Sequence, residues 1–151
     1  MFSTPFFYSR PSAVHLSAHM RHLLTFCFFS WLCWIIWLAD TAQEFFFFEL
    51  IREIPGGDKI GHFCLFGGLA WLLNRSLKYR GFHLGPISLQ WGAVVVMAFA
   101  AGEEFSQQLF PNRTFDGVDL LADFCGVACF SLFQQACLHR RSGEAGEESL
   151  K

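Results

Sequence analysis

The segment HLLTFCFFSWLCWIIWLA, His22–Ala39, decides the fold because it contains no Asp, Glu, Lys or Arg. A helix that crosses a membrane needs about 20 mostly apolar residues, and this segment is nearly long enough. Arg10 and Arg21 before it would fit a signal peptide, but its apolar stretch exceeds the roughly 7–15 residues of a signal core. Its end, WIIWLAD, also lacks a cleavage site of small residues. The segment therefore predicts an uncleaved first membrane helix.

Three further uncharged runs follow, over residues 60–74, 81–102 and 124–139. The middle one is long enough to span a membrane, whereas the other two must begin at Asp58 and near Val118 to reach that length. The composition agrees, because 53% of the 151 residues are hydrophobic and only 16% are charged. The mean hydropathy is +0.35. So few charges make too thin a polar surface for a soluble domain.

The pattern predicts an all-α protein, an integral membrane bundle of four transmembrane helices at about 22–39, 58–77, 86–108 and 117–139. Residues 1–21 are expected to form a cytoplasmic arm, and residues 140–151 a disordered cytoplasmic tail. Phe45–Phe48 predict a short helix on the membrane surface in the first outer loop.

The distribution of Lys and Arg predicts the orientation of the bundle. Four spans place both termini on one side of the membrane. With the N-terminus inside, most of the 11 basic residues lie inside, and the outer segments hold only Arg52, Lys59 and Arg113. Since inner loops are the more basic ones, the N-terminus and C-terminus are predicted to be cytoplasmic.

The six cysteines all lie in the apolar runs and form no CxxC motif, so packing is their expected role rather than disulfides or metal binding. A net charge of −2 without a basic patch gives no reason to expect a nucleic-acid partner. The sequence also lacks a nucleophilic serine motif, a phosphate loop and an HExxH motif, and no cofactor is expected.

Polar residues gather where the N-in arrangement predicts the outer ends of three helices. Asp58 follows Pro-Gly-Gly, so it could cap its helix, or pair with His62 four residues later on the same face. Glu104 and Gln107 share a face near the end of the next helix. A carboxylate at a helix C-terminus is unfavourable by up to about 1 kcal/mol, so Arg113 or Lys59 is expected to compensate Glu104. Glu103 lies on another face and is expected to meet solvent.

Three aspartates lead into the last helix. Asp116 can cap it, and Asp119 falls at the third position, where the helix dipole favours negative charge. Asp123 lies beyond capping reach on the face of Asp119 and Gly126, so it needs a partner. The expected partners are His62 and Lys59, with Arg113 as a further choice.

The stretches DKIGHF and EFSQQLFPNRTFDGVDLLADFCG together resemble the VanZ-like family of bacterial membrane proteins. Its pattern has Asp-Lys-x-x-His entering one helix, Glu-x-x-Gln closing the next, and Arg-x-x-Asp-x-x-Asp before a last helix with a polar residue and Gly. The match covers about residues 58–130, and the N-terminal third and the tail carry no signature. Many members carry Asn at the position of Asp123. The matching residues are Asp58, Lys59, His62, Glu104, Gln107, Arg113, Asp116, Asp119 and Gly126.

The resemblance implies a multi-pass protein of the bacterial cytoplasmic (inner) membrane, and the family is named after a protein that lowers susceptibility to the glycopeptide teicoplanin. We expect the outer polar cluster to bind a lipid headgroup or a cell-wall precursor, or to hold the helices together. The alternatives are a metal-assisted hydrolase or transferase acting on an envelope lipid, and a small proton-coupled transporter. No catalytic residue is identified, and the oligomeric state is left open.

Overall fold

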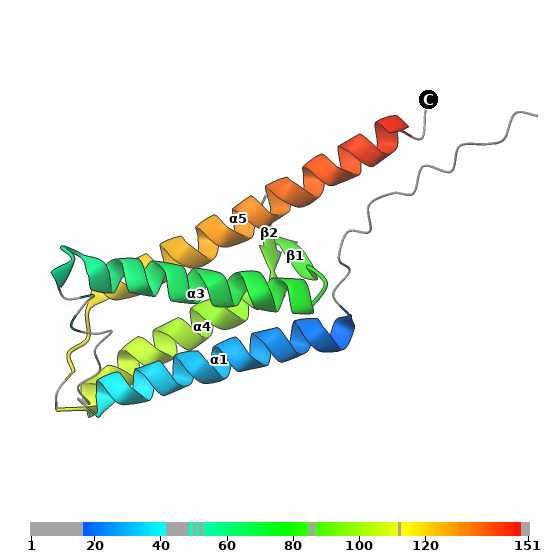
Figure 1. The fold of residues 1–151 in the computed structure, drawn as a ribbon. Coiled ribbons are helices and arrows are strands. Elements are labelled where there is room, and N and C mark those ends of the chain that lie inside the picture. The colour runs from blue at the N-terminus through cyan, green and yellow to red at the C-terminus, as the bar shows by residue number, and fades with distance from the viewer. Residues whose placement is uncertain are drawn as a thin grey trace, which may run out of the picture.

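The computed structural model describes residues 17–41, 49, 51, 53–84, 87–111 and 113–148. Its elements are α1 (Ala18–Asp40), α3 (Gly57–Ser76), β1 (Gly81–Leu84), β2 (Ile87–Gln90), α4 (Trp91–Ser106), the 3₁₀ turn η1 (Gln107–Leu109) and α5 (Gly117–Glu148). Successive helices run in opposite directions, so α1 begins and α5 ends at the same end of the bundle (Figure 1). The structure is mostly helical, as the sequence predicted. The predicted surface helix at Phe45–Phe48 lies outside the described residues.

Residues 81–84 and 87–90 form two paired β-strands, where the sequence had predicted a loop and the start of a helix from residue 86. Gly81 pairs with Gln90 and Leu84 with Ile87 in an antiparallel register. The segment GFHLGPISLQ alternates apolar and polar residues on both sides of Gly-Pro, which is a strand pattern. The absence of charged residues in this run obscured the alternation. Because the second strand extends to Gln90, α4 begins only at Trp91.

The last helix is also longer than predicted, because α5 continues to Glu148 where a disordered tail had been expected from residue 140. Within the part of the chain that the structure describes, two helical segments, Ala18–Asp40 and Gly117–Arg140, are long and apolar enough to cross a membrane. Helix α4, with 16 residues, is shorter than the span of about 20 that a bilayer requires. Four transmembrane spans therefore stay a prediction.

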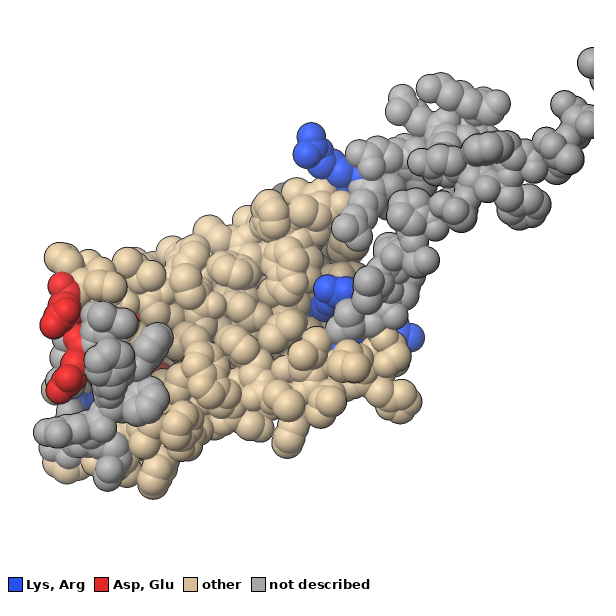
Figure 2. Space-filling model, in the orientation of Figure 1, with Lys and Arg blue, Asp and Glu red and all other residues tan. Residues whose placement is uncertain are grey.

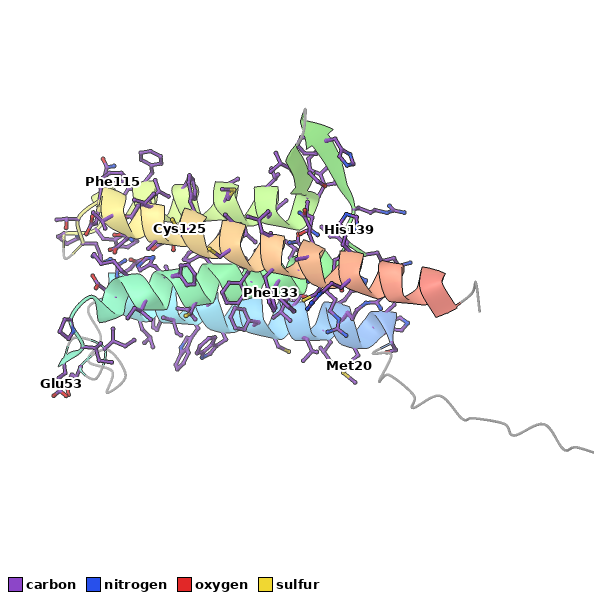
Figure 3. All side chains as sticks on the ribbon, turned by 90° about the horizontal axis from the view of Figure 1, so that it is seen from above. Met20, Glu53, Phe115, Cys125, Phe133 and His139 are labelled. Carbon is purple, nitrogen blue, oxygen red and sulfur yellow. The ribbon has the colours of Figure 1, made fainter. Side chains whose placement is uncertain are left out.

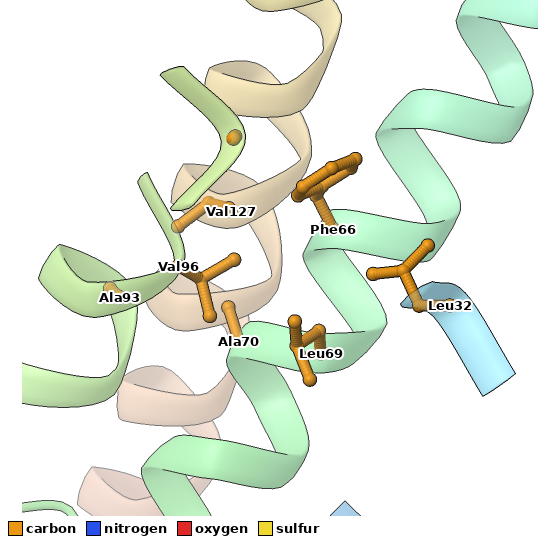
Figure 4. Packing of buried hydrophobic residues seen from close by; sticks show 8 residues of the cluster. Leu32, Phe66, Leu69, Ala70, Ala93, Val96 and Val127 are labelled. Carbon is orange, nitrogen blue, oxygen red and sulfur yellow. The ribbon is translucent and has the colours of Figure 1, made fainter. Parts of the chain in front are cut away.

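The core lies where α3 meets α1, α4 and α5. Phe66, Leu69 and Ala70 of α3 are buried against Leu32 of α1 and Val127 of α5, together with Ala93, Val96 and Ala100 of α4 (Figure 4). Outward-facing aromatic and aliphatic side chains such as Trp34, Trp37 and Leu132 are exposed in this single chain. That arrangement suits a protein whose outer surface meets lipid.

Helices α3 and α5 approach so closely that glycine is required at their contact. A Cβ at Gly126 would collide with the carbonyl oxygen of Phe63, and one at Gly67 would lie 2.9 Å from the carbonyl oxygen of Gly126. Small residues at a helix crossing allow this approach in membrane bundles. Gly126 lies on the same face of α5 as Asp119 and Asp123, so the close approach occurs on the face that carries these carboxylates.

Charge is divided between the two ends of the bundle. Figure 2 shows acidic side chains at the end where α3 begins, and Lys and Arg side chains toward the opposite end. The view from above places Glu53 and Phe115 at the first end, with Met20 and His139 toward the other (Figure 3). We call the end that contains Glu53 and Phe115 the acidic end. The start of α3, the end of α4 and the start of α5 meet there.

Candidate functional site: a carboxylate network at the acidic end

Lys59, in the first turn of α3, holds three carboxylates together. Its Nζ atom donates to Asp58 Oδ2 at 2.7 Å, to Asp119 Oδ1 at 2.8 Å and to Asp116 Oδ2 at 3.2 Å. The ammonium thereby joins α3 to the loop before α5 and to the first turn of α5. Asp58 does not cap α3 as one interpretation had it, because the helix begins at Gly57 and its N-cap is Gly56.

Asp116 caps α5, as the sequence predicted. Its Oδ1 accepts the backbone N–H of Val118 at 2.8 Å, which satisfies one of the free N–H groups at the start of the helix. That hydrogen bond, and the neighbouring Lys59 ammonium, hold the pKa of the Asp116 carboxyl below its usual value. Asp119, in the first turn of α5, instead directs its side chain to Lys59. The two residues therefore have different roles in the network.

Asp123 is fully buried and pairs with His62 across the α3–α5 contact. The distance from His62 Nδ1 to Asp123 Oδ1 is 3.0 Å, and His62 Nε2 lies 4.0 Å from Asp119 Oδ2. The predicted pairing of Asp123 with His62 is therefore present. The other predicted partners were wrong, because Lys59 and Arg113 pair with different carboxylates. The second oxygen of Asp123, Oδ2, is buried without a hydrogen-bond partner.

Glu104 is fully buried at the end of α4, and neither predicted cation compensates it. Its Oε1 accepts the backbone N–H of Asp116 at 2.6 Å, and its Oε2 accepts from Gln107 Nε2 at 3.0 Å. Glu104 and Gln107 therefore act together on one face, as their spacing predicted. A backbone N–H and an amide replace the expected ion pair because the loop before α5 folds back over the end of α4.

Arg113 pairs with two carboxylates that the sequence analysis did not assign to the site. Its Nη2 lies 3.7 Å from Glu103 Oε1, and its Nε lies 3.9 Å from Asp40 Oδ1 at the end of α1. The expectation that Glu103 meets solvent was wrong, since its side chain is 5% exposed and also accepts from Gln107 Nε2 at 3.0 Å. The spacing of four residues between Glu103 and Gln107 was the signal that could have revealed this.

A second polar network lies toward the opposite end and involves none of the predicted site residues. The Oδ1 atom of buried Asn74 accepts the backbone N–H of Ala93 at 3.0 Å, and its Nδ2 donates to Ser131 Oγ at 3.1 Å. Asn74 thereby caps the start of α4 from α3, because α4 has no side-chain cap of its own. Gln135 Nε2 donates to the backbone oxygen of Ser88 at 3.1 Å and holds the hairpin. These bonds fix the fold and suggest no ligand.

The acidic end brings all nine predicted site residues into one connected region and adds Asp40 and Glu103. Within the described parts of the chain, no group of three or more His, Cys, Asp or Glu side chains has the geometry to hold a metal ion. The region contains buried carboxylate oxygens and more acidic than basic side chains.

Comparison with known proteins gives one match. A family model described as VanZ/LLP1 matches residues 2–137. The chain belongs to the VanZ/LLP1 family. The match begins well before Asp58, so the expectation that the N-terminal third carries no family signature was wrong. No curated protein and no solved structure matches the chain.

Membership of the VanZ/LLP1 family and the two apolar helices together indicate a membrane protein. The VanZ-like motifs quoted from the sequence lie on α3, at the end of α4 and at the start of α5, and the fold brings them together at the acidic end.

Proposed function

We propose that this VanZ-like chain is a multi-pass protein of the bacterial cytoplasmic membrane, with both termini in the cytoplasm and the acidic end facing outward. The division of charge supports this orientation, because Lys and Arg favour the cytoplasmic side and gather at the end where α1 begins and α5 ends (Figure 2). Helices α3 and α4 would then complete four spans. Their charged residues would lie at the outer boundary of the membrane.

We further propose that the network at the acidic end binds an envelope lipid headgroup or a cell-wall precursor. The observation that carries this proposal is the buried carboxylate Asp123, which has one oxygen on His62 and the other without a partner. A purely structural network would be expected to satisfy both oxygens, since an unpartnered buried acceptor costs about 1–3 kcal/mol. A bound polar group would supply the missing donor.

A role in glycopeptide susceptibility would follow if the bound component belongs to the cell wall. This part of the proposal rests on the resemblance to the family whose namesake lowers susceptibility to teicoplanin. Its test is the minimum inhibitory concentration of teicoplanin in a deletion strain and in the complemented strain. An unchanged concentration in both would contradict it.

Native mass spectrometry of the full chain, purified in mild detergent from bacterial membranes, tests the binding itself. We expect envelope lipids or lipid-linked wall precursors to co-purify with the wild-type chain and to decrease in the Asp123→Asn variant. Asn retains an oxygen that can accept from His62, so the fold is expected to persist. A spectrum of the protein alone, with no envelope component retained, would contradict the proposal.

The metal-assisted hydrolase or transferase and the proton-coupled transporter stay predictions. Incubation with envelope lipids followed by product analysis tests the first. For the second, pH-dependent flux in proteoliposomes is the measurement, and a flat response to pH would remove it.

A further inference from the structure

We propose that the network at the acidic end takes a primary ammonium group, which Glu103 of α4 and Asp123 of α5 accept. This inference rests on the proposed function, because it names the chemical group that an envelope component would present to that site. The ammonium can belong to a lipid headgroup or to a soluble amine. The structure indicates the chemical group that binds, and the experiment below distinguishes its two sources.

The first argument is charge balance among the described residues that make up the network at the acidic end. Two side chains carry a permanent positive charge, Lys59 and Arg113, and His62 is the one further basic group in the network. Seven carboxylates surround them, Asp40, Asp58, Glu103, Glu104, Asp116, Asp119 and Asp123. The excess of acidic groups persists even if His62 is protonated. Such an end attracts cations and repels anions.

The second argument is that both cations are already engaged. Lys59 donates to three carboxylates within 3.2 Å. Arg113 lies between Asp40 and Glu103. A phosphate group would have to displace carboxylates from one of these cations, and the neighbouring acidic groups would repel it. The charged group of a ligand that enters this network is therefore a cation.

The third argument points to particular atoms. Asp123 Oδ2 and Glu103 Oε2 are buried and have no hydrogen-bond partner. Their side chains are 0% and 5% exposed. An ionised carboxylate only accepts hydrogen bonds, so what these atoms lack is a donor. Both residues belong to the network, because Asp123 pairs with His62 and Gln107 Nε2 donates to both Glu103 and Glu104.

The fourth argument is that the network already holds one primary ammonium. The Lys59 ammonium, with its three N–H donors directed at three carboxylates, shows the coordination that a ligand ammonium would seek. Exposure falls from 57% at Asp58 and 41% at Asp116 to 15% at Asp119 and 0% at Asp123. The carboxylates therefore range from exposed to fully buried, and their combined charge would attract a cation to this end.

The experiment measures binding of defined lipids to the full chain in detergent by native mass spectrometry. Phosphatidylethanolamine presents a primary ammonium, phosphatidylcholine has a quaternary ammonium without N–H donors, and phosphatidylglycerol is an anion without an amine. We expect phosphatidylethanolamine to bind at least about tenfold more tightly than the other two, because charge-assisted hydrogen bonds distinguish it. Competition by free ethanolamine would assign the site to soluble amines as well. Failure of ethanolamine to compete would assign it to the lipid.

Matched variants connect that selectivity to the named atoms. Glu103→Gln and Asp123→Asn each remove one negative charge and keep an acceptor oxygen, so we expect each to weaken phosphatidylethanolamine binding about tenfold. Glu53→Gln is the control, because Glu53 is an exposed carboxylate outside the network. Size-exclusion profiles that match the wild type would show that the variants fold.

The possible failures are distinguishable. Preferential binding of phosphatidylglycerol would overturn the ammonium site but leave envelope-lipid binding intact. Unchanged phosphatidylethanolamine binding in both variants would overturn the assignment to Glu103 and Asp123, and would fit carboxylates that carry their own protons. If neither these lipids nor any co-purified envelope component binds, the proposed function fails as well.

Discussion

Glu104 and the backbone N–H of Asp116 form a 2.6 Å hydrogen bond that joins the end of α4 to the start of α5. Glu104 is fully buried, so this bond lies away from water. A carboxylate near a helix C-terminus opposes the helix dipole, and the bond to Asp116 together with the amide of Gln107 offsets that cost. The last turn of α4 is thereby fixed where the carboxylate network begins.

Replacing Glu104 tests how much this link stabilises the bundle. Glu104→Ala leaves the N–H of Asp116 without its acceptor, so we expect unfolding free energy to fall by about 1–3 kcal/mol. Glu104→Gln keeps an oxygen for that N–H and should cost less. Thermal unfolding in detergent is the measurement, with Gln108→Ala at an exposed neighbour as the control. Equal stability of the Ala variant and the wild type would show that the link is dispensable.

A substitution at Gly126 tests the close approach of α3 and α5. Gly126→Ala adds a Cβ that would collide with the carbonyl oxygen of Phe63, so we expect a loss of about 1–3 kcal/mol as the helices move apart. Gly61→Ala and Gly102→Ala are matched controls, because a Cβ at either meets nothing within 4 Å. These two should be neutral or stabilising by up to about 1 kcal/mol. The same loss at all three positions would contradict the packing argument.

The ion pairs of Lys59 with carboxylates are expected to make the stability of the fold depend on pH. The folded pKa of Asp116 is lowered, so its contribution is present above the unfolded value of about 4 and is lost as pH falls through the folded value. In Lys59→Met the carboxylates lose their common cation, so stability should fall modestly at neutral pH and recover relative to the wild type on acidification.

Melting temperatures of wild type, Lys59→Met and Lys59→Arg between pH 3 and pH 7 measure this effect. Arg keeps the positive charge and serves as the control. Parallel pH profiles for the wild type and the Met variant would show that the ammonium does not govern the acidic end.

Reporter fusions test the proposed orientation and the number of spans. A reporter joined after Phe46 or Asn112 should be active outside the cytoplasm, and one joined after Tyr79 or at the C-terminus should be active inside. The physical reason is that the basic residues between α3 and α4 favour the cytoplasmic side. An external Tyr79 would overturn the arrangement of four spans.

Local patterns in the sequence determined much of the fold. Uncharged runs predicted helices near 22–39, 58–77 and 117–139, and the structure has α1, α3 and α5 there. Spacing along a helix likewise predicted that Asp116 caps α5 and that Glu104 and Gln107 share a face. Such inferences succeed because hydrogen bonding and burial within one helix depend on residues three or four positions apart.

Only the tertiary structure decided which groups pair. Arg113 was expected to compensate Glu104 but lies beside Glu103 and Asp40. Glu104 instead accepts a backbone N–H from the loop before α5. Lys59 was expected to reach Asp123 but binds Asp58, Asp116 and Asp119 instead, and Asp123 pairs with His62. Several carboxylates compete for few cations at the acidic end. Distances set by helix packing, rather than by position in the chain, determine the outcome of that competition.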